Sequence, residues 1–309
     1  MKRLYGVTTA MVTPMTADQN IDMEGVEKLT DFLVDKGVDC LFPLGTTGEM
    51  FKLTIEERKK IAEKVIDSNK ERLTVFIHAG GMTTKDTLEL ARHALQTGAD
   101  GIGVVSPVFF GANDVEIKNY YKEISFALPD DFPIYLYNIP QLSGNDLSVS
   151  VVKELAEECT NIVGLKYSYP DFPRLNEYLN ATPEDFSILT GADGLFLPAM
   201  AMGCDGVVSG VSGVFPEPFV KVYELYSNSE WEEARKMQAS ANEVISILKA
   251  GANMSYFKKG LDLRGLKGGS VRNPQQNISS QEEFQLKEQL NQWMHENSNI
   301  NLSKQKFEV

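Results

Sequence analysis

The chain has 309 residues, of which 42% are hydrophobic and 24% are charged. These values are typical of a globular protein and exclude a disordered or fibrous one. A chain of this length buries enough surface to fold without disulfides or structural metals. Asp and Glu number 43 against 30 Lys and Arg, and the net charge of −13 argues against nucleic acid or an anionic membrane surface as the main partner.

The cysteines predict neither a disulfide framework nor a metal site, because Cys40, Cys159 and Cys204 are widely spaced and form no C-x-x-C pair. The three histidines are too few and too scattered to add a metal cluster. The N-terminus lacks the apolar core of a secretory signal, and no stretch reaches the roughly 18 uninterrupted apolar residues of a membrane span. We therefore expect a cytoplasmic protein with reduced thiols.

Eight short apolar runs recur along the chain, and most of them end in small or turn residues. They are rich in Val, Ile, Leu and Phe and do not alternate cleanly, which is typical of strands buried on both faces of a parallel sheet. The expected strands are Gly6–Thr13, Asp39–Leu44, Leu73–Ala79, Gly101–Ser106, Ile134–Tyr137, Ile162–Lys166, Phe186–Leu189 and Gly206–Ser209.

Amphipathic helical patterns separate these runs. Thr54-Ile55-Glu56-Glu57 has the form of a capping box, which predicts a helix over Thr54–Ser68. Regular alternation of strand and helix favours a (β/α)8 barrel. A doubly wound open sheet is the alternative, but the chain has no dinucleotide-binding fingerprint. The other predicted helices are Met23–Lys36, Thr84–Thr97, Val115–Ala127, Ser148–Glu158, Pro173–Asn180 and Ala192–Gly203.

The strand pattern stops before Pro218, so we expect the barrel over residues 1–218 and a helical region over residues 219–295. A polar, flexible tail is expected over residues 296–309. Gly265–Gln276 is rich in Gly, Asn and Pro and predicts a loop. The helices expected in the C-terminal region are Phe219–Ser227, Glu230–Ala250 and Glu282–His295.

In barrel enzymes the chemistry lies at the carboxyl ends of the strands. Gly45-Thr46-Thr47-Gly48-Glu49 follows the second strand, where its hydroxyls and consecutive amides can bind one small anion such as a carboxylate. The alternative is a turn whose threonines cap the next helix. Tyr137 ends the fifth strand and can relay a proton through its phenol, or it is a tyrosine of the core.

Lys166 ends the apolar run of the sixth strand, although lysine is almost never fully buried without a reason. Burial at the barrel mouth favours the free amine that a Schiff-base nucleophile needs. The alternative is a lysine whose head reaches solvent. Polar groups also follow the seventh and eighth strands, either as contacts for substrate hydroxyls or as helix N-caps; they lie in Thr190-Gly191-Ala192-Asp193-Gly194 and Ser209-Gly210.

Three of these segments resemble, in order and spacing, the signatures of the dihydrodipicolinate synthase / N-acetylneuraminate lyase superfamily. They are Gly45-Thr46-Thr47-Gly48-Glu49, Tyr137-Asn138-Ile139-Pro140 and Gly164-Leu165-Lys166. The resemblance extends from Gly6 to about residue 295. It implies a (β/α)8 barrel with a C-terminal helical region, class I aldolase chemistry on pyruvate, and no metal or cofactor beyond the covalent imine. It also implies a homotetramer or homodimer.

The resemblance further implies a role for each matched residue. Lys166 would form a Schiff base with the C2 ketone of pyruvate, and Tyr137 would relay protons. The carboxylate of pyruvate would bind at Thr46, Thr47 and Gly48, with Thr47 also part of the catalytic set. Lyases of the superfamily hold the distal hydroxyls of a sugar acid at the positions of Ser168, Gly191, Asp193 and Ser209.

The sequence departs from the synthase branch at two places. Leu142 stands where that branch has an arginine for the carboxylate of aspartate semialdehyde, and an isobutyl group cannot make that bidentate contact. Pro107-Val108-Phe109-Phe110 lacks the tyrosine hydroxyl of the synthase proton relay. Tyr137–Gly144 is more similar to N-acetylneuraminate lyase, although Gly194 stands where that lyase has a glutamate.

We therefore expect a pyruvate-dependent lyase for a sugar acid or a related 2-keto acid. Two alternatives remain. One is the synthase that condenses pyruvate with aspartate semialdehyde, and the other is a barrel that binds a 2-keto acid without catalysis.

Overall fold

Eight parallel strands close into a barrel in the computed structural model, which describes residues 1–298 and residue 300. The strands follow one another in chain order, and β8 pairs with β1. The closed barrel confirms the predicted (β/α)8 architecture and excludes the open sheet. Each strand overlaps a predicted run: β1 Gly6–Ala10, β2 Cys40–Phe42, β3 Thr74–His78, β4 Gly101–Val105, β5 Ile134–Asn138, β6 Ile162–Tyr167, β7 Ser187–Thr190 and β8 Gly206–Ser209.

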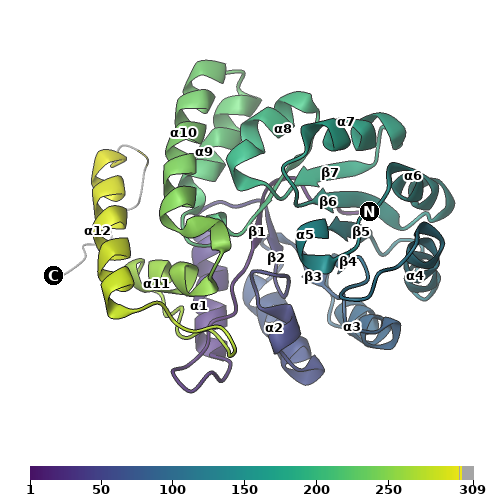
Figure 1. Ribbon diagram of the computed structural model, residues 1–309, viewed down its shortest axis with the longest axis horizontal. Coiled ribbons are helices and arrows are strands. Elements are labelled where there is room, and N and C mark those ends of the chain that lie inside the picture. The colour runs from purple at the N-terminus through teal and green to yellow at the C-terminus, as the bar shows by residue number, and fades with distance from the viewer. Residues whose placement is uncertain (299, 301–309) are drawn as a thin grey trace.

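Helices surround the strands (Figure 1). The predicted capping box is present at the start of α2, where the Glu57 amide donates to Thr54 Oγ1 at 3.2 Å and the Thr54 amide donates to the Glu57 carboxylate at 2.8 Å. The helices of this ring are α1 Met23–Asp35, α2 Ile55–Asn69, α3 Thr84–Gln96, α4 Asp114–Phe126, α6 Val149–Glu158, α7 Phe172–Ala181 and α8 Phe196–Met202.

The structure adds two helices that the sequence analysis missed. A four-residue helix, α5 (Pro140–Ser143), follows β5 directly and is too short to show a periodic pattern. The predicted helix Glu230–Ala250 is shorter than expected, because α10 (Trp231–Ile247) ends before a turn in which Ala250 has φ +47°. A separate helix, α11 (Met254–Leu263), begins after that turn.

The C-terminal helices gather on one side of the barrel, where α12 (Ser280–Glu296) packs against α10 and α11 (Figure 1). The first of them, α9 (Pro216–Ser227), packs against α10 and β1. Within residues 1–298, the structure contains no helix of the length and apolar character that crossing a membrane requires. Of the expected tail, residue 299 and residues 301–309 lie outside the described residues, and Ile300 is buried.

Aromatic rings and glycines fit together inside the barrel. A Cβ atom built on Gly103 would lie 2.3 Å from the Phe42 ring, and one on Gly164 would lie 2.3 Å from the Tyr135 ring. Phe76 and Tyr135 meet edge to face, with ring centroids 5.2 Å apart. The glycines thus leave room for rings that fill the interior, and Phe42 forms the layer directly below the site described next.

Replacement of Gly103 by alanine tests this packing. We expect G103A to lose about 1–3 kcal/mol of unfolding free energy, because the new methyl group overpacks the Phe42 ring. Gly111 is the matched control, since a Cβ atom there meets nothing within 4 Å and its φ is not positive. Urea denaturation of G103A and G111A measures the difference, and equal stabilities would contradict the packing described here.

Candidate active site

Lys166 and Tyr137 lie side by side at the carboxyl ends of neighbouring strands. The register of β5 and β6 pairs the two residues directly. Lys166 Nζ lies 3.8 Å from the centroid of the Tyr137 ring and 4.9 Å from that of Phe42. Lys166 is only 4% exposed. The amine is thus enclosed by aromatic faces, so Lys166 is not a lysine whose head reaches bulk solvent.

The threonine loop, residues 45–49, brings a hydroxyl to the same place. Thr46 Oγ1 lies 3.1 Å from the Tyr137 hydroxyl, within hydrogen-bond distance. Gly48 supports the loop from behind, because its carbonyl accepts a hydrogen bond from Thr13 Oγ1 at 2.7 Å. A Cβ atom at Gly48 would lie 3.0 Å from the Leu44 amide nitrogen, so a side chain there would crowd the backbone of the loop.

A pocket of about 460 Å³ joins these groups. It brings together seven of the residues singled out from the sequence: Thr46, Thr47, Tyr137, Lys166, Ser168, Gly191 and Asp193. Gly48 and Ser209 do not line it. The pocket therefore spans the carboxyl ends of β2, β5, β6 and β7.

Ser209 does not line the pocket but contacts Asp193, which does. The Ser209 hydroxyl donates to Asp193 Oδ2 at 2.9 Å, and the Val211 amide donates to the same oxygen at 3.3 Å. Burial raises the pKa of Asp193 to about 6, although both donors and the charge of Lys166 act to lower it. Asp193 can accordingly act as a hydrogen-bond acceptor or as a neutral acid near physiological pH.

A buried histidine packs against the Tyr137 ring. His78 meets the Tyr137 ring edge to face at 5.8 Å, and His78 Nε2 lies 3.3 Å from the Val105 amide nitrogen, which donates to it. Burial, with the positive charges of Arg58 and Lys166, holds the pKa of His78 well below its ordinary value, so the ring is neutral. Arg58 itself donates to the carbonyls of Gly80 and His78 at 2.8 Å.

The sequence analysis did not single out several of the residues that line the pocket. Gln141 follows the Tyr-Asn-Ile-Pro segment, and its Nε2 donates to the Ser168 carbonyl at 2.7 Å. Its position next to that segment could have identified it. Leu142, which the sequence analysis did single out, also lines the pocket. Met254 and Phe257 of α11 also line the pocket. They lie far along the chain from the strand-end segments, and only the tertiary fold brings them together.

The described residues contain no group of three or more His, Cys, Asp or Glu side chains that could hold a metal ion. The chemistry that this geometry supports belongs to an enclosed amine, a phenol and hydroxyls. These are the parts required for imine formation with a small keto acid.

The chain is similar to two curated relatives. One is an uncharacterized DapA-like lyase of Halobacterium salinarum, 36% identical over 287 residues, which are 93% of each chain. The other is the 4-hydroxy-tetrahydrodipicolinate synthase of Methanosphaerula palustris, 32% identical over 92% of this chain and 98% of the relative.

Two solved structures, each 30% identical to this chain, are similar to it over nearly its whole length. The sialic acid aldolase of Ruminococcus gnavus, solved as a catalytic lysine mutant, has a TM-score of 0.91 over 97% of this chain and 100% of its own. The Escherichia coli K12 prophage protein YagE, solved with pyruvate, has a TM-score of 0.90 over 94% of this chain and 99% of its own.

Residues 3–293 match the dihydrodipicolinate synthetase family. Members of this family are Schiff-base lyases in which a lysine–pyruvate imine takes the place of a separate cofactor. The chain belongs to the dihydrodipicolinate synthetase family and is a class I, pyruvate-dependent aldolase or lyase.

Proposed function

We propose that the protein reversibly cleaves a 2-keto sugar acid, or a related 2-keto acid, into pyruvate and an aldehyde. The observation that carries this proposal is the enclosed Lys166 amine, 3.8 Å from the centroid of the ring whose hydroxyl contacts Thr46. An amine beside a phenol in one pocket supports the roles of nucleophile and proton relay that we propose for Lys166 and Tyr137.

Imine formation is the first step. The Lys166 amine adds to the C2 ketone; the C2 oxygen gains one proton that the amine loses and a second from the Tyr137 phenol, and it leaves as water. The resulting iminium accepts the electron pair of the C3–C4 bond when that bond breaks. The Tyr137 phenolate takes the proton of the C4 hydroxyl, so that C4 and its oxygen leave as an aldehyde. Protonation of the enamine at C3 and hydrolysis of the imine then release pyruvate and the free lysine.

The two ends of the substrate require different contacts. Thr46, Thr47 and the loop amides bind the carboxylate next to C2, because hydroxyls and amides are donors suited to an anion. Ser168, Gly191 and Asp193 line the same pocket and would contact the aldehyde half, and the Ser209 hydroxyl donates to Asp193.

A sugar-acid substrate fits the charges of the pocket better than aspartate semialdehyde does. Lys166 is the only cationic residue among the described residues that line the pocket, and Leu142 occupies the wall where the synthase branch has an arginine. A second carboxylate would have no guanidinium to bind. The similarity to a sialic acid aldolase supports the same choice. The synthase remains the second candidate, supported by the 32% identical relative from Methanosphaerula. A homotetramer or homodimer stays a prediction.

Borohydride trapping tests the imine directly. With pyruvate and borohydride we expect a stoichiometric pyruvyl adduct on Lys166, located by peptide mass spectrometry, because this amine lines the pocket and is enclosed beside a phenol. K166R is the control and should give no adduct. An adduct spread over surface lysines, or none in the wild-type protein, would favour the non-catalytic binding barrel.

Leu142 tests the choice of aldehyde. We expect wild-type protein to cleave members of a panel of 2-keto sugar acids, including N-acetylneuraminate, and to condense pyruvate with aspartate semialdehyde poorly. L142R should raise kcat/KM for aspartate semialdehyde by roughly tenfold or more, because a bidentate carboxylate contact is a strong one. L142M keeps the volume without the charge and should leave that value unchanged. Efficient condensation by the wild type would identify the synthase instead.

Asp193 has a pH-dependent effect on stability. Its pKa is raised from 3.8 to about 6, so the folded protein binds more protons than the unfolded chain between these values. Stability conferred on the wild type by the protonated carboxyl is thus present below about pH 4 and is lost as the pH rises through about 6. D193N should gain on the order of 1 kcal/mol relative to wild type between pH 4 and pH 7.5. Urea titrations at both pH values measure this, and a constant difference would contradict the raised pKa.

A further inference from the structure

The threonine loop is held by contacts from outside the barrel. Its last residue, Glu49, is 5% exposed and adopts a left-handed backbone conformation with φ +61°. The Glu49 carboxylate forms ion pairs with Lys258 Nζ at 2.7 Å and with Lys52 Nζ at 2.9 Å. It also accepts a hydrogen bond from the backbone amide of Arg272 at 3.0 Å. Arg272 is 223 positions away in the chain, so a distant segment determines how this loop ends.

Lys258 connects the loop to the C-terminal region. It lies on α11 with a side chain that is 0% exposed, and Nζ also donates to the Ser270 carbonyl at 2.6 Å. Burial acts to raise the pKa of Glu49, but Lys258 and Lys52 outweigh it and hold that pKa below its ordinary value. The pair is therefore an ionised carboxylate 2.7 Å from the Nζ of a fully buried lysine side chain.

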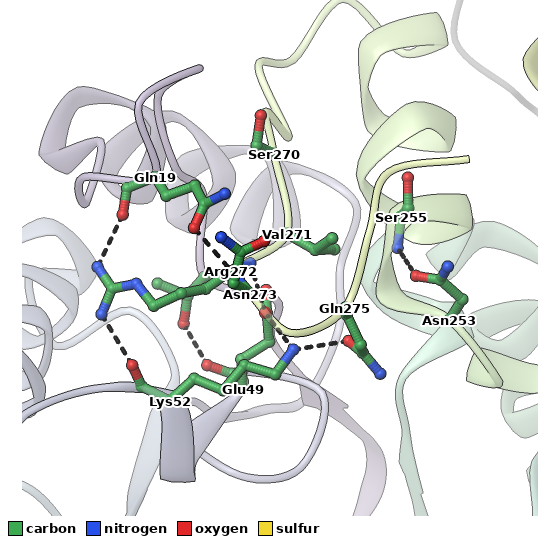
Figure 2. Close-up of polar contacts among 12 residues, drawn as sticks. Gln19, Glu49, Lys52, Asn253, Ser255, Ser270, Val271, Arg272, Asn273 and Gln275 are labelled. Atoms are coloured by element: carbon green, nitrogen blue, oxygen red, sulfur yellow. Dashed lines mark hydrogen bonds and ion pairs between the residues drawn. The ribbon is translucent and has the colours of Figure 1, made fainter. Parts of the chain in front are cut away.

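Arg272 forms the outer part of the same assembly. Its guanidinium donates to both oxygens of Glu57, at 2.7 and 2.8 Å, and to the carbonyls of Lys52 and Gln19, at 2.9 and 2.7 Å. Lys52 Nζ reaches Gln275 at 2.7 Å. Figure 2 shows the segment with Ser270, Val271, Arg272, Asn273 and Gln275 lying along Gln19, Glu49 and Lys52.

A buried ion pair is a poor source of net stability, because desolvation of both charges offsets most of their attraction. What such a pair provides is a defined geometry, and here it fixes a residue with unfavourable backbone angles next to Thr46, Thr47 and Gly48. The same α11 that carries Lys258 also contributes Met254 and Phe257 to the wall of the pocket. The C-terminal region therefore contacts the site in two ways, through the Lys258–Glu49 ion pair and through the two pocket residues of α11.

We propose that Glu49, Lys258 and Arg272 form a clamp through which the C-terminal region holds the threonine loop in the geometry that binds the substrate carboxylate. They are positioning residues and do not touch substrate. The inference rests on the proposed function, because it requires that the loop bind the carboxylate of pyruvate.

The test is a pyruvate titration of borohydride trapping on Lys166, which yields a half-saturating concentration and a maximal rate. In E49Q the half-saturating pyruvate concentration should rise by about tenfold or more, since displacement of a binding group by about 1 Å can cost a factor of about 100. The maximal rate per folded molecule should stay within about twofold, because the amine and Tyr137 are unchanged. A merely structural loss would reduce the amount of folded protein without moving half-saturation.

The matched control is R264M. Arg264 forms a buried ion pair with Glu217 in the same C-terminal region, and neither residue contacts the threonine loop. R264M should lose stability and keep the wild-type half-saturating concentration. If E49Q does not fold, R272M takes its place, because that side chain is 18% exposed and its loss leaves the Glu49–Lys258 pair intact. R272M should raise the half-saturating pyruvate concentration by about threefold. The rise is smaller than in E49Q because R272M removes only the guanidinium contacts and keeps the backbone amide of residue 272 and Lys258 on Glu49.

The outcomes separate the two proposals. Unchanged half-saturation in E49Q or R272M, or an equal rise in R264M, would overturn the clamp while leaving the proposed function intact. Failure of wild-type protein to form a Lys166 adduct would refute the proposed function, and the clamp with it.

Discussion

The site depends on keeping one primary amine out of water. Lysine is costly to bury, and Lys166 lies at the barrel mouth with only 4% of its surface exposed. Aromatic rings of Tyr137 and Phe42 replace part of its hydration. This enclosure requires the register in which Lys166 pairs with Tyr137 of β5 and with Leu189 of β7.

The interior of the barrel supplies the floor for this arrangement. Phe42 fits there because Gly103 carries no side chain, and His78 and Tyr137 meet edge to face. Phe42 also contacts both His78 and Tyr137 through tilted and edge-to-face ring contacts. Close packing of this kind transmits strain, so the position of the amine is linked to glycines that have no chemical role.

The upper side of the pocket is built differently, from loops and charges. The threonine loop provides donors for an anion, while Glu49 at its end is anchored to α11 and to the segment around Arg272. Hydrophobic packing is not directional, whereas hydrogen bonds to a carboxylate have defined directions. In the arrangement that we propose, the strands hold the amine, and the C-terminal region holds the loop that would bind the substrate carboxylate.

The sequence by itself determined the local features of this protein. Strand order, the capping box at Thr54 and the three strand-end segments follow from patterns within a few residues, so the barrel and the residues Lys166, Tyr137 and Thr46 could be predicted. Other features depended on contacts between distant residues. Ser209 turned out to hold Asp193 behind the pocket wall, and Met254, Phe257 and Lys258 on an unpredicted helix complete the site. No periodic pattern records such contacts, because they arise only when strand closure and helix packing bring the two ends of the chain together.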